Sequence, residues 1–153
     1  MTGLRVLGWR EHVGLPHLGI PDIKAKVDTG ARTSSLQAFD PEPYMDVDRE
    51  RIRFLVRPAQ GDDSALVPCD LPVHDWRWIK DSGGHATFRP IILTPVRVGS
   101  IEFTAELSLA SRADMGFRML LGREALRGRF VVDASQSYVA TAGVDVEAVA
   151  LSD

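Results

Sequence analysis

Residues 25–36 read AKVDTGARTSSL, and the prediction of the fold starts from this stretch. Every second residue over Ile23–Val27 is apolar, which predicts a strand with one buried face. Asp28 follows where this strand ends, and Gly30 permits a backbone turn that other residues resist. With a return strand beginning at 34–36, the carboxylate would lie in a turn where backbone N–H groups can surround it. That is how a catalytic aspartate is presented, and the ordinary turn chemistry of Asp and Gly is the alternative.

A second motif lies far downstream, where residues 119–126 read MLLGREAL. The two motifs together resemble those of the retropepsin-like aspartic peptidases. In that fold the apolar strand before the glycine passes through the loop that carries the aspartate, and a short helix follows. The chain is more specifically similar to the bacterial RimB-like family, whose members are often labelled ATP-dependent zinc proteases. This resemblance covers about Leu4 to Tyr138, and its segments are Val6–Glu11, Lys24–Leu36, Ser82–His85, Arg89–Ile92 and Met115–Phe130.

Thirteen glycines and nine prolines interrupt the chain at short intervals, which favours short strands over long helices. We therefore expect an all-β, retropepsin-like closed barrel with one short C-terminal helix over Glu124–Leu126, ended near Gly128. Besides the strand that ends at Asp28, the expected strands are Leu4–Trp9, Arg51–Arg57, Ala65–Cys69, Ile101–Leu109 and Arg118–Leu121, with a final hairpin of Phe130–Asp133 and Gln136–Thr141. The expected irregular segments are a turn between Pro16 and Pro21, the loops Asp40–Asp48 and Ser111–Phe117, and a loosely ordered tail from Val144.

Two β-prone runs, Trp76–Lys80 and Ala86–Arg89, flank a segment that contains Gly83 and Gly84. This pattern predicts a β-hairpin. In retropepsins a glycine-tipped hairpin, the flap, closes over the substrate, and the resemblance implies the same role here, with the two glycines giving the flap its mobility. A plain surface hairpin is the alternative.

Length and composition predict one globular domain over residues 1–153. The net charge of −3 argues against nucleic-acid binding as the main task. Cys69 is the only cysteine, which suits a reducing compartment, and we expect it to lie in the interior as a small hydrophobe. The chain has no apolar run long enough for a membrane span and no signal-peptide pattern, so we expect no membrane partner and a cytoplasmic location.

Aspartic-peptidase chemistry needs two carboxylates that share one proton. One acts as base on a bound water, while the other is protonated and polarises the scissile carbonyl. The sequence has one Asp-Thr-Gly, at Asp28–Gly30, so we expect a homodimer with its two-fold axis between Asp28 and the symmetry mate. By resemblance, Thr29 bonds across the dimer and Gly30 leaves room for the substrate backbone. Leu121 and Gly122 would be structural parts of the site, with Gly122 letting the threaded strand pass close to the aspartate loop.

The sequence departs from viral retropepsins after Asp-Thr-Gly-Ala, where they usually carry an acidic residue and this chain has Arg32. We hypothesise that some of the basic residues near the motifs line the cleft and select an acidic substrate, and that Arg32 favours activity nearer neutral pH. These basic residues are Lys24, Lys26, Arg32, Arg77, Lys80, Arg89, Arg118 and Arg123. The RimB-like resemblance implies removal of glutamates that an ATP-grasp ligase adds to a ribosomal protein, with the ligase as a possible partner. The candidate substrate-binding residues are Ala31, Arg32, Lys80, Ser82, Gly83, Gly84, Arg89, Arg118 and Arg123. Solvated strand faces are the alternative for most of these charges, with Arg32 as the exception.

The sequence gives little support for a bound cofactor. It has no His-Glu-x-x-His, no cysteine pair and no ligand spacing among its four histidines, and a metal site would have to be assembled from distant residues. It also lacks a Gly-rich Lys-Ser/Thr loop for ATP and a nucleophile elbow for serine hydrolysis. We therefore expect no metal and no cofactor. The alternatives to an aspartic peptidase are a retropepsin-fold binding module without catalysis and a zinc-dependent peptidase.

Overall fold

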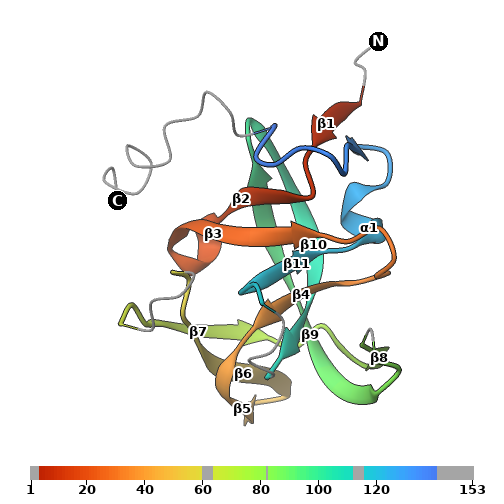
Figure 1. Cartoon of the computed structure of the whole chain (residues 1–153). Coiled ribbons are helices and arrows are strands. Elements are labelled where there is room, and N and C mark those ends of the chain that lie inside the picture. Colours follow the sequence, from red (N-terminus) through yellow and green to blue (C-terminus); the bar gives the residue numbers. More distant parts are fainter. Residues whose placement is uncertain (1–3, 60–63, 82, 112–115, 141–153) are drawn as a thin grey trace.

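Strands make up most of the computed structural model, which describes residues 4–59, 64–81, 83–111 and 116–140 (Figure 1). The described residues contain one α-helix, which is a single turn long. The strands are β1 (Arg5–Leu7), β2 (Arg10–Leu15), β3 (Ile20–Val27), β4 (Ser34–Gln37), β5 (Phe39–Asp46), β6 (Arg49–Val56), β7 (Val67–Pro72), β8 (Asp75–Lys80), β9 (Ala86–Val98), β10 (Ile101–Ala110), β11 (Met119–Leu121) and β12 (Phe130–Val132). The helices are the 3-10 turn η1 (Pro16–Leu18) and α1 (Arg123–Leu126). The all-β class with one short helix is therefore confirmed.

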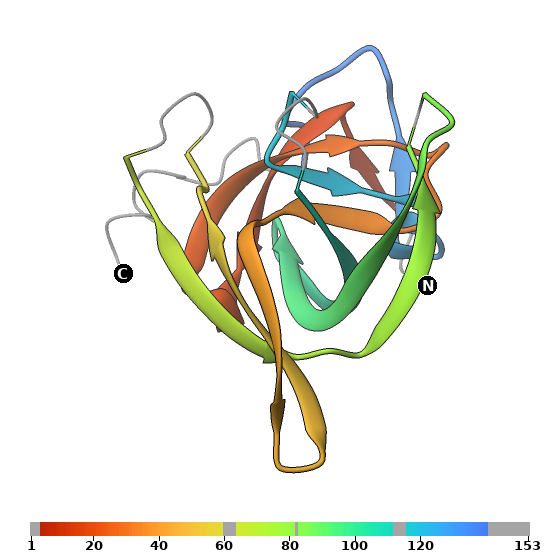
Figure 2. The ribbon, with the colours of Figure 1, turned by 90° about the horizontal axis from the view of Figure 1, so that it is seen from below.

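The central sheet has seven strands in the order β10-β4-β11-β3-β2-β9-β8. Strand β9 also pairs with β10, so the pairings of six of these strands run in a ring (Figure 2). One residue pair, Gly14 with Arg97, joins β2 to β9. The core lies inside this ring, and its fully buried side chains include Leu15, Ile23, Leu36, Ile92, Leu107 and Met119.

The short strand β11 lies between β3 and β4, as the resemblance implied. It runs parallel to β3, with Met119 opposite Ala25 and Leu121 opposite Val27. It runs antiparallel to β4, with Leu120 opposite Ser35. The two strands that flank the aspartate turn therefore do not pair with each other, because the downstream motif occupies the place between them.

Strand β3 shows the expected alternation, because Ile23, Ala25 and Val27 are buried while Lys26 is exposed. Each buried side chain adds apolar area to the core at roughly 25 cal/mol per Å² removed from water. The register places Asp28 at the end of the strand, where it leaves the core.

The loop expected over Asp40–Asp48 is wrong, because β5 and β6 form a hairpin across it. Pro43 lies opposite Ile52 in that hairpin. Strand β5 is an edge strand of the three-stranded sheet β5-β6-β7, and an edge strand tolerates proline because one side of it needs no ladder hydrogen bonds. The turn of the hairpin contains Val47, whose φ is 59°.

Strand β2 was not predicted, and the expected turn between Pro16 and Pro21 covers only part of a longer hairpin. Strands β2 and β3 pair in antiparallel fashion around η1, which ends at Gly19 with φ 70°. The sequence of β2 lacks the alternation of apolar and polar residues that predicts a strand, because the fully buried residue Glu11 is charged.

The expected C-terminal hairpin is also wrong. Strand β12 pairs in parallel with β1, with Val6 opposite Val131. Residues 136–140 form no strand, and the tail from Val144 lies outside the described residues. The oxygen Oε2 of Glu11 accepts hydrogen bonds from the N–H groups of Gly8, Val139 and Ala140 at 2.7, 2.8 and 3.2 Å. A buried carboxylate therefore joins the two ends of the described chain.

Several other expected elements agree with the structure, whereas the loop expected over Ser111–Phe117 lies largely outside the described residues. Strand β6, the β8–β9 hairpin, strand β10 and helix α1 lie where the sequence predicted them. Cys69 is buried, and burial raises the pKa of its thiol to about 11. Within the described ranges, no helix is long and apolar enough to cross a membrane.

Candidate active site

Asp28 lies half-buried at the end of β3, where its carboxylate is held by the turn that follows. Its Oδ1 accepts a hydrogen bond from the backbone N–H of Gly30 at 2.9 Å. The backbone N–H of Asp28 donates to the carbonyl of Leu121 at 2.9 Å, and that of Ala31 donates to the carbonyl of Asp28 at 3.3 Å. The turn therefore orients the carboxylate and leaves Thr29 and Gly30 exposed beside it.

Helix α1 holds the rest of this loop. The N–H of Arg123 donates to the carbonyl of Ala31 at 2.7 Å, and the N–H of Glu124 donates to that of Arg32 at 3.0 Å. The Arg123 guanidinium also donates to the carbonyl of Thr29 at 3.2 Å. Amides at the start of a helix lack partners within the helix, so these loop carbonyls satisfy them. The second motif thus braces the first.

Gly122 is the point of closest approach between the two motifs. A Cβ atom at this position would lie 2.8 Å from the carbonyl carbon of Thr33 and 2.9 Å from the carbonyl oxygen of Ala31. The backbone N–H of Gly122 donates to Oγ of Ser34 at 2.9 Å. The preceding Leu121 is fully buried. Only glycine fits here without moving the aspartate loop.

The β8–β9 hairpin lies on the same side of the molecule as the aspartate loop in both ribbon views (Figures 1 and 2). Its turn is held by Asp81, whose Oδ1 accepts from the N–H groups of Gly83 and His85, both at 2.9 Å. Gly84 has φ +83°, which favours glycine. Ser82 was named as a substrate-binding candidate and lies outside the described residues.

The predicted basic residues do not form one group. Arg32 and Arg123 lie on the aspartate loop and helix α1; the Arg32 side chain is 80% exposed, and its Nε is 3.9 Å from Oε1 of Glu124. Arg118 lies at the end of β11 away from Gly122, where it donates to Gln37 at 3.0 Å. Arg89 donates to Thr87 at 2.7 Å on β9, and Lys80 is exposed on β8.

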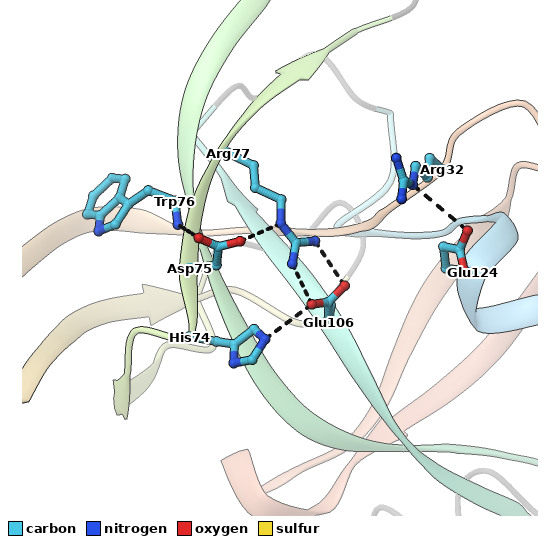
Figure 3. Close-up of polar contacts among 7 residues, drawn as sticks. All are labelled: Arg32, His74, Asp75, Trp76, Arg77, Glu106 and Glu124. Atoms are coloured by element: carbon cyan, nitrogen blue, oxygen red, sulfur yellow. Dashed lines mark hydrogen bonds and ion pairs between the residues drawn. The ribbon is translucent and has the colours of Figure 1, made fainter.

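A group of charged residues beside the loop contains Arg77, one of the basic residues near the motifs, but none of its members was a predicted substrate-binding residue. We call it the Arg77 cluster; its members are His74, Asp75, Arg77 and Glu106 (Figure 3). Arg77 on β8 donates to both oxygens of Glu106 on β10, at 2.9 and 2.7 Å. Its Nε donates to Asp75 at 2.7 Å, and Nε2 of His74 is 3.3 Å from Glu106.

The charges in the Arg77 cluster stabilise one another. The hydrogen bonds from Arg77 hold the pKa of the Glu106 carboxyl below its usual range, and Glu106 in turn raises the pKa of Arg77. One feature of the sequence distinguishes Arg77 from its neighbours on β8. Side chains alternate along a strand, so Arg77 must face the opposite side of β8 from Trp78 and Lys80.

Two pockets lie near these elements. A pocket of about 220 Å³ separates Glu106 from Glu124 and is also lined by Thr33, Ser34, Thr104 and Arg129. A second pocket of about 230 Å³ lies under the base of the β8–β9 hairpin, between Trp76, Phe88 and Pro41. Asp28 lines neither of these two pockets.

No group of three or more His, Cys, Asp or Glu side chains in the described part of the chain is placed to hold a metal ion.

Comparison with known proteins gives both relatives and a similar fold. A "Probable alpha-L-glutamate ligase" from Desulfotalea psychrophila is 42% identical over 84% of this chain, and one from Parasynechococcus marenigrum is 41% identical over 90%. The chain spans only 28% and 30% of the length of these relatives.

A crystal structure of a Legionella pneumophila protein of unknown function matches with a TM-score of 0.74 at 21% identity, over 90% of this chain and 99% of that one. This likeness supports the fold. Residues 6–142 match the family described as "Retropepsin-like aspartic endopeptidase RimB". The chain therefore belongs to the RimB-like family of retropepsin-like aspartic endopeptidases.

Proposed function

We propose that this protein is an aspartic peptidase whose active site forms between Asp28 and the Asp28 of a second copy. The observation that carries the proposal is the Asp28 carboxylate, which is half-buried, hydrogen-bonded to Gly30 at 2.9 Å, and braced from behind by β11 and α1. A pure binding module has no need of a carboxylate oriented in this way. The exposed Thr29 and Gly30 leave the aspartate accessible to a partner subunit.

The chemistry follows from bringing two such carboxylates together. Two like charges about 3 Å apart cannot both ionise, so the pair shares one proton. The ionised carboxylate takes a proton from a bound water, which attacks the scissile carbonyl, while the protonated carboxylate donates a hydrogen bond to the carbonyl oxygen. The tetrahedral intermediate then collapses, the C–N bond breaks, and the carboxyl group that took the proton from water gives it to the leaving amine. The β8–β9 hairpin would act as the flap that covers the substrate.

We propose a glutamate-rich peptide as the substrate, such as a tail added to a ribosomal protein by an ATP-grasp ligase. Two observations support this choice. Relatives named glutamate ligases contain a segment 41–42% identical to this chain, which links the fold to glutamate chemistry. Arg32 and Arg123 flank the aspartate loop, and guanidinium groups bind carboxylates well.

A binding module for such a ligase is the second candidate. It is favoured by the same relatives, in which the matching segment is 28–30% of a longer chain that bears the ligase name. In that case the domain would hold the ligase or its product, and Asp28 would be dispensable.

The test compares cleavage of one glutamate-tailed peptide by the wild-type protein, by Asp28→Asn and by the wild type with a chelator. We expect Asp28→Asn to lose at least ~10³-fold in kcat/KM while chelation has no effect, because the mutation removes the base and the shared proton. Activity that survives Asp28→Asn and is abolished by the chelator would support a metallopeptidase. Binding of the peptide or ligase without cleavage by any sample would support the binding module.

A further inference from the structure

Arg77 is the best-coordinated cation near the aspartate loop. Its guanidinium forms a bidentate pair with Glu106 at 2.9 and 2.7 Å, while its Nε is held by Asp75 at 2.7 Å. The side chains of Arg77 and Glu106 remain 35% and 34% exposed. The pair is therefore reachable from solvent, although every contact of the guanidinium goes to a carboxylate of the protein.

The position of Glu106 places this pair beside the aspartate loop. Strands β10 and β4 run parallel, with Leu107 opposite Ser34. Glu106 therefore lies next to Thr33, the last residue before β4, and both residues line the pocket of about 220 Å³. Figure 3 shows the Arg77 cluster on one side of this region and the Arg32–Glu124 pair on the other.

Strand β8 turns Arg77 toward this region rather than away from it. The ring of Phe88 stacks on that of Trp76 and contacts that of Trp78 at a tilt, which places both tryptophans on one face of the β8–β9 hairpin. Arg77 lies between them in sequence, so its side chain projects from the opposite face, where it contacts Glu106 of β10. Arg77 would thus lie on the inner face of the flap.

We propose that Arg77 determines specificity by binding a glutamate side chain of the substrate, and that Glu106 occupies this receptor in the free protein. This inference rests on the proposed function. A guanidinium fork fits one carboxylate at a time, and the side chain of Glu106 carries the same group as a substrate glutamate. When the substrate displaces Glu106, Asp75 would keep Arg77 oriented, and His74, which lies 3.3 Å from Glu106 in the free protein, would be its alternative partner.

A purely structural role for the Arg77–Glu106 contacts predicts a different effect on peptide binding. If the Arg77–Glu106 pair only clamps the hairpin to β10, breaking it should change the binding of any peptide equally. If Glu106 competes with substrate, removing its charge should strengthen the binding of glutamate peptides alone.

The experiment measures Kd by fluorescence anisotropy for two labelled peptides, one ending in four glutamates and one in four glutamines. All proteins carry Asp28→Asn to prevent cleavage. We expect Glu106→Gln to bind the glutamate peptide about 3- to 10-fold more tightly and Arg77→Gln about 10-fold more weakly, with the glutamine peptide unaffected. The control is Asp70→Asn, which removes the carboxylate paired with Arg51 at 3.0 Å on the β5-β6-β7 sheet, and it should change neither Kd.

Equal changes for both peptides, or no change in either variant, would overturn the proposal. If Arg77→Gln fails to fold, Arg77→Lys replaces it, and we expect an intermediate loss because lysine keeps the charge without the fork. Failure of the proposed function gives a different result, namely no Asp28-dependent cleavage while the charge-selective binding persists. A third result is cleavage that depends on Asp28, together with Arg77 and Glu106 variants that do not distinguish the glutamate peptide from the glutamine peptide. That result would overturn the inference about Arg77 and leave the proposed function standing.

Discussion

Single residues at two positions join segments that are distant in the chain. Gly122 lets the backbone of the second motif touch the aspartate loop, with its N–H on Ser34. Glu11 is a fully buried carboxylate that accepts three backbone N–H groups from the two ends of the described chain. Gly122 therefore positions the aspartate loop, whereas Glu11 holds the two ends of the described chain together.

Gly122→Ala should both destabilise the protein and reduce its activity. The new Cβ would lie 2.8 Å from the backbone of Thr33, and overpacking of this kind costs about 1–3 kcal/mol of unfolding free energy. Urea unfolding measures the loss. Gly30→Ala is the matched control, because its Cβ would meet only the Asp28 carboxylate, at 3.2 Å. Equal unfolding free energies for Gly122→Ala and wild type would contradict the close approach.

Glu11→Gln should lower the unfolding free energy by about 1–3 kcal/mol, because an amide is a weaker acceptor than a carboxylate and brings two donors into a cage of donors. Glu42→Gln, at an exposed position on β5, serves as the control and should stay within about 0.5 kcal/mol of wild type. The measurement is thermal or urea unfolding of both variants. A Glu11→Gln protein as stable as the control would show that the buried carboxylate is not needed.

At the scale of elements, the Arg77 cluster joins two strands of the central sheet that do not pair directly. Arg77 lies on the edge strand β8, and Glu106 lies on β10, which is joined to β8 through β9. A charge pair therefore fastens β8 to β10, and in the proposed function it lies on the hairpin that would act as the flap.

The pair should make hairpin stability depend on pH. Arg77 lowers the pKa of Glu106 in the folded protein, so the stabilisation is present above the unfolded pKa of about 4.5 and is lost as pH falls through the lower folded value. The difference in unfolding free energy between wild type and Glu106→Gln should thus be at most about 1 kcal/mol at pH 7, since the pair is partly exposed, and should vanish in acid. Denaturant unfolding at pH 7, 5 and 3 measures it. A difference that grows toward pH 3 would contradict the assignment.

The elements with strong local patterns could be predicted from the sequence. Apolar and polar residues alternate along the sequence of β10, and the pair Gly83–Gly84 indicates the turn of a hairpin. The two motifs revealed the threaded strand β11 only through resemblance, because nothing within residues 119–121 specifies the strands beside it.

The remaining features depend on contacts that distant segments make. Pro41 and Pro43 indicated a loop, but an edge strand accepts them. Glu106 is 29 residues from Arg77, and their pairing depends on the register of three strands. Of the cations named as candidates from sequence, Arg32 and Arg123 lie at the aspartate loop, whereas Arg118 lies at the far end of β11.

At the scale of the whole molecule, one copy of the chain supplies a single Asp-Thr-Gly motif, at Asp28–Gly30. Two valines of the β1–β12 sheet are also accessible, since Val6 and Val131 lie opposite each other and are 41% and 46% exposed. In the proposed dimer, a second copy would supply the other Asp28.

The central claim is that each active site contains the Asp28 side chains of two copies. Wild-type protein is mixed with an equal amount of Asp28→Asn, and subunit exchange is verified by native mass spectrometry. After random exchange, about a quarter of the dimers carry two aspartates, and only these are active in our account. Total activity should therefore be about a quarter of that of wild-type protein at the same total protein concentration. With mixed dimers present, a value of about one half would mean that each subunit acts alone, and about three quarters would mean that one aspartate suffices in a shared site; either would contradict the account.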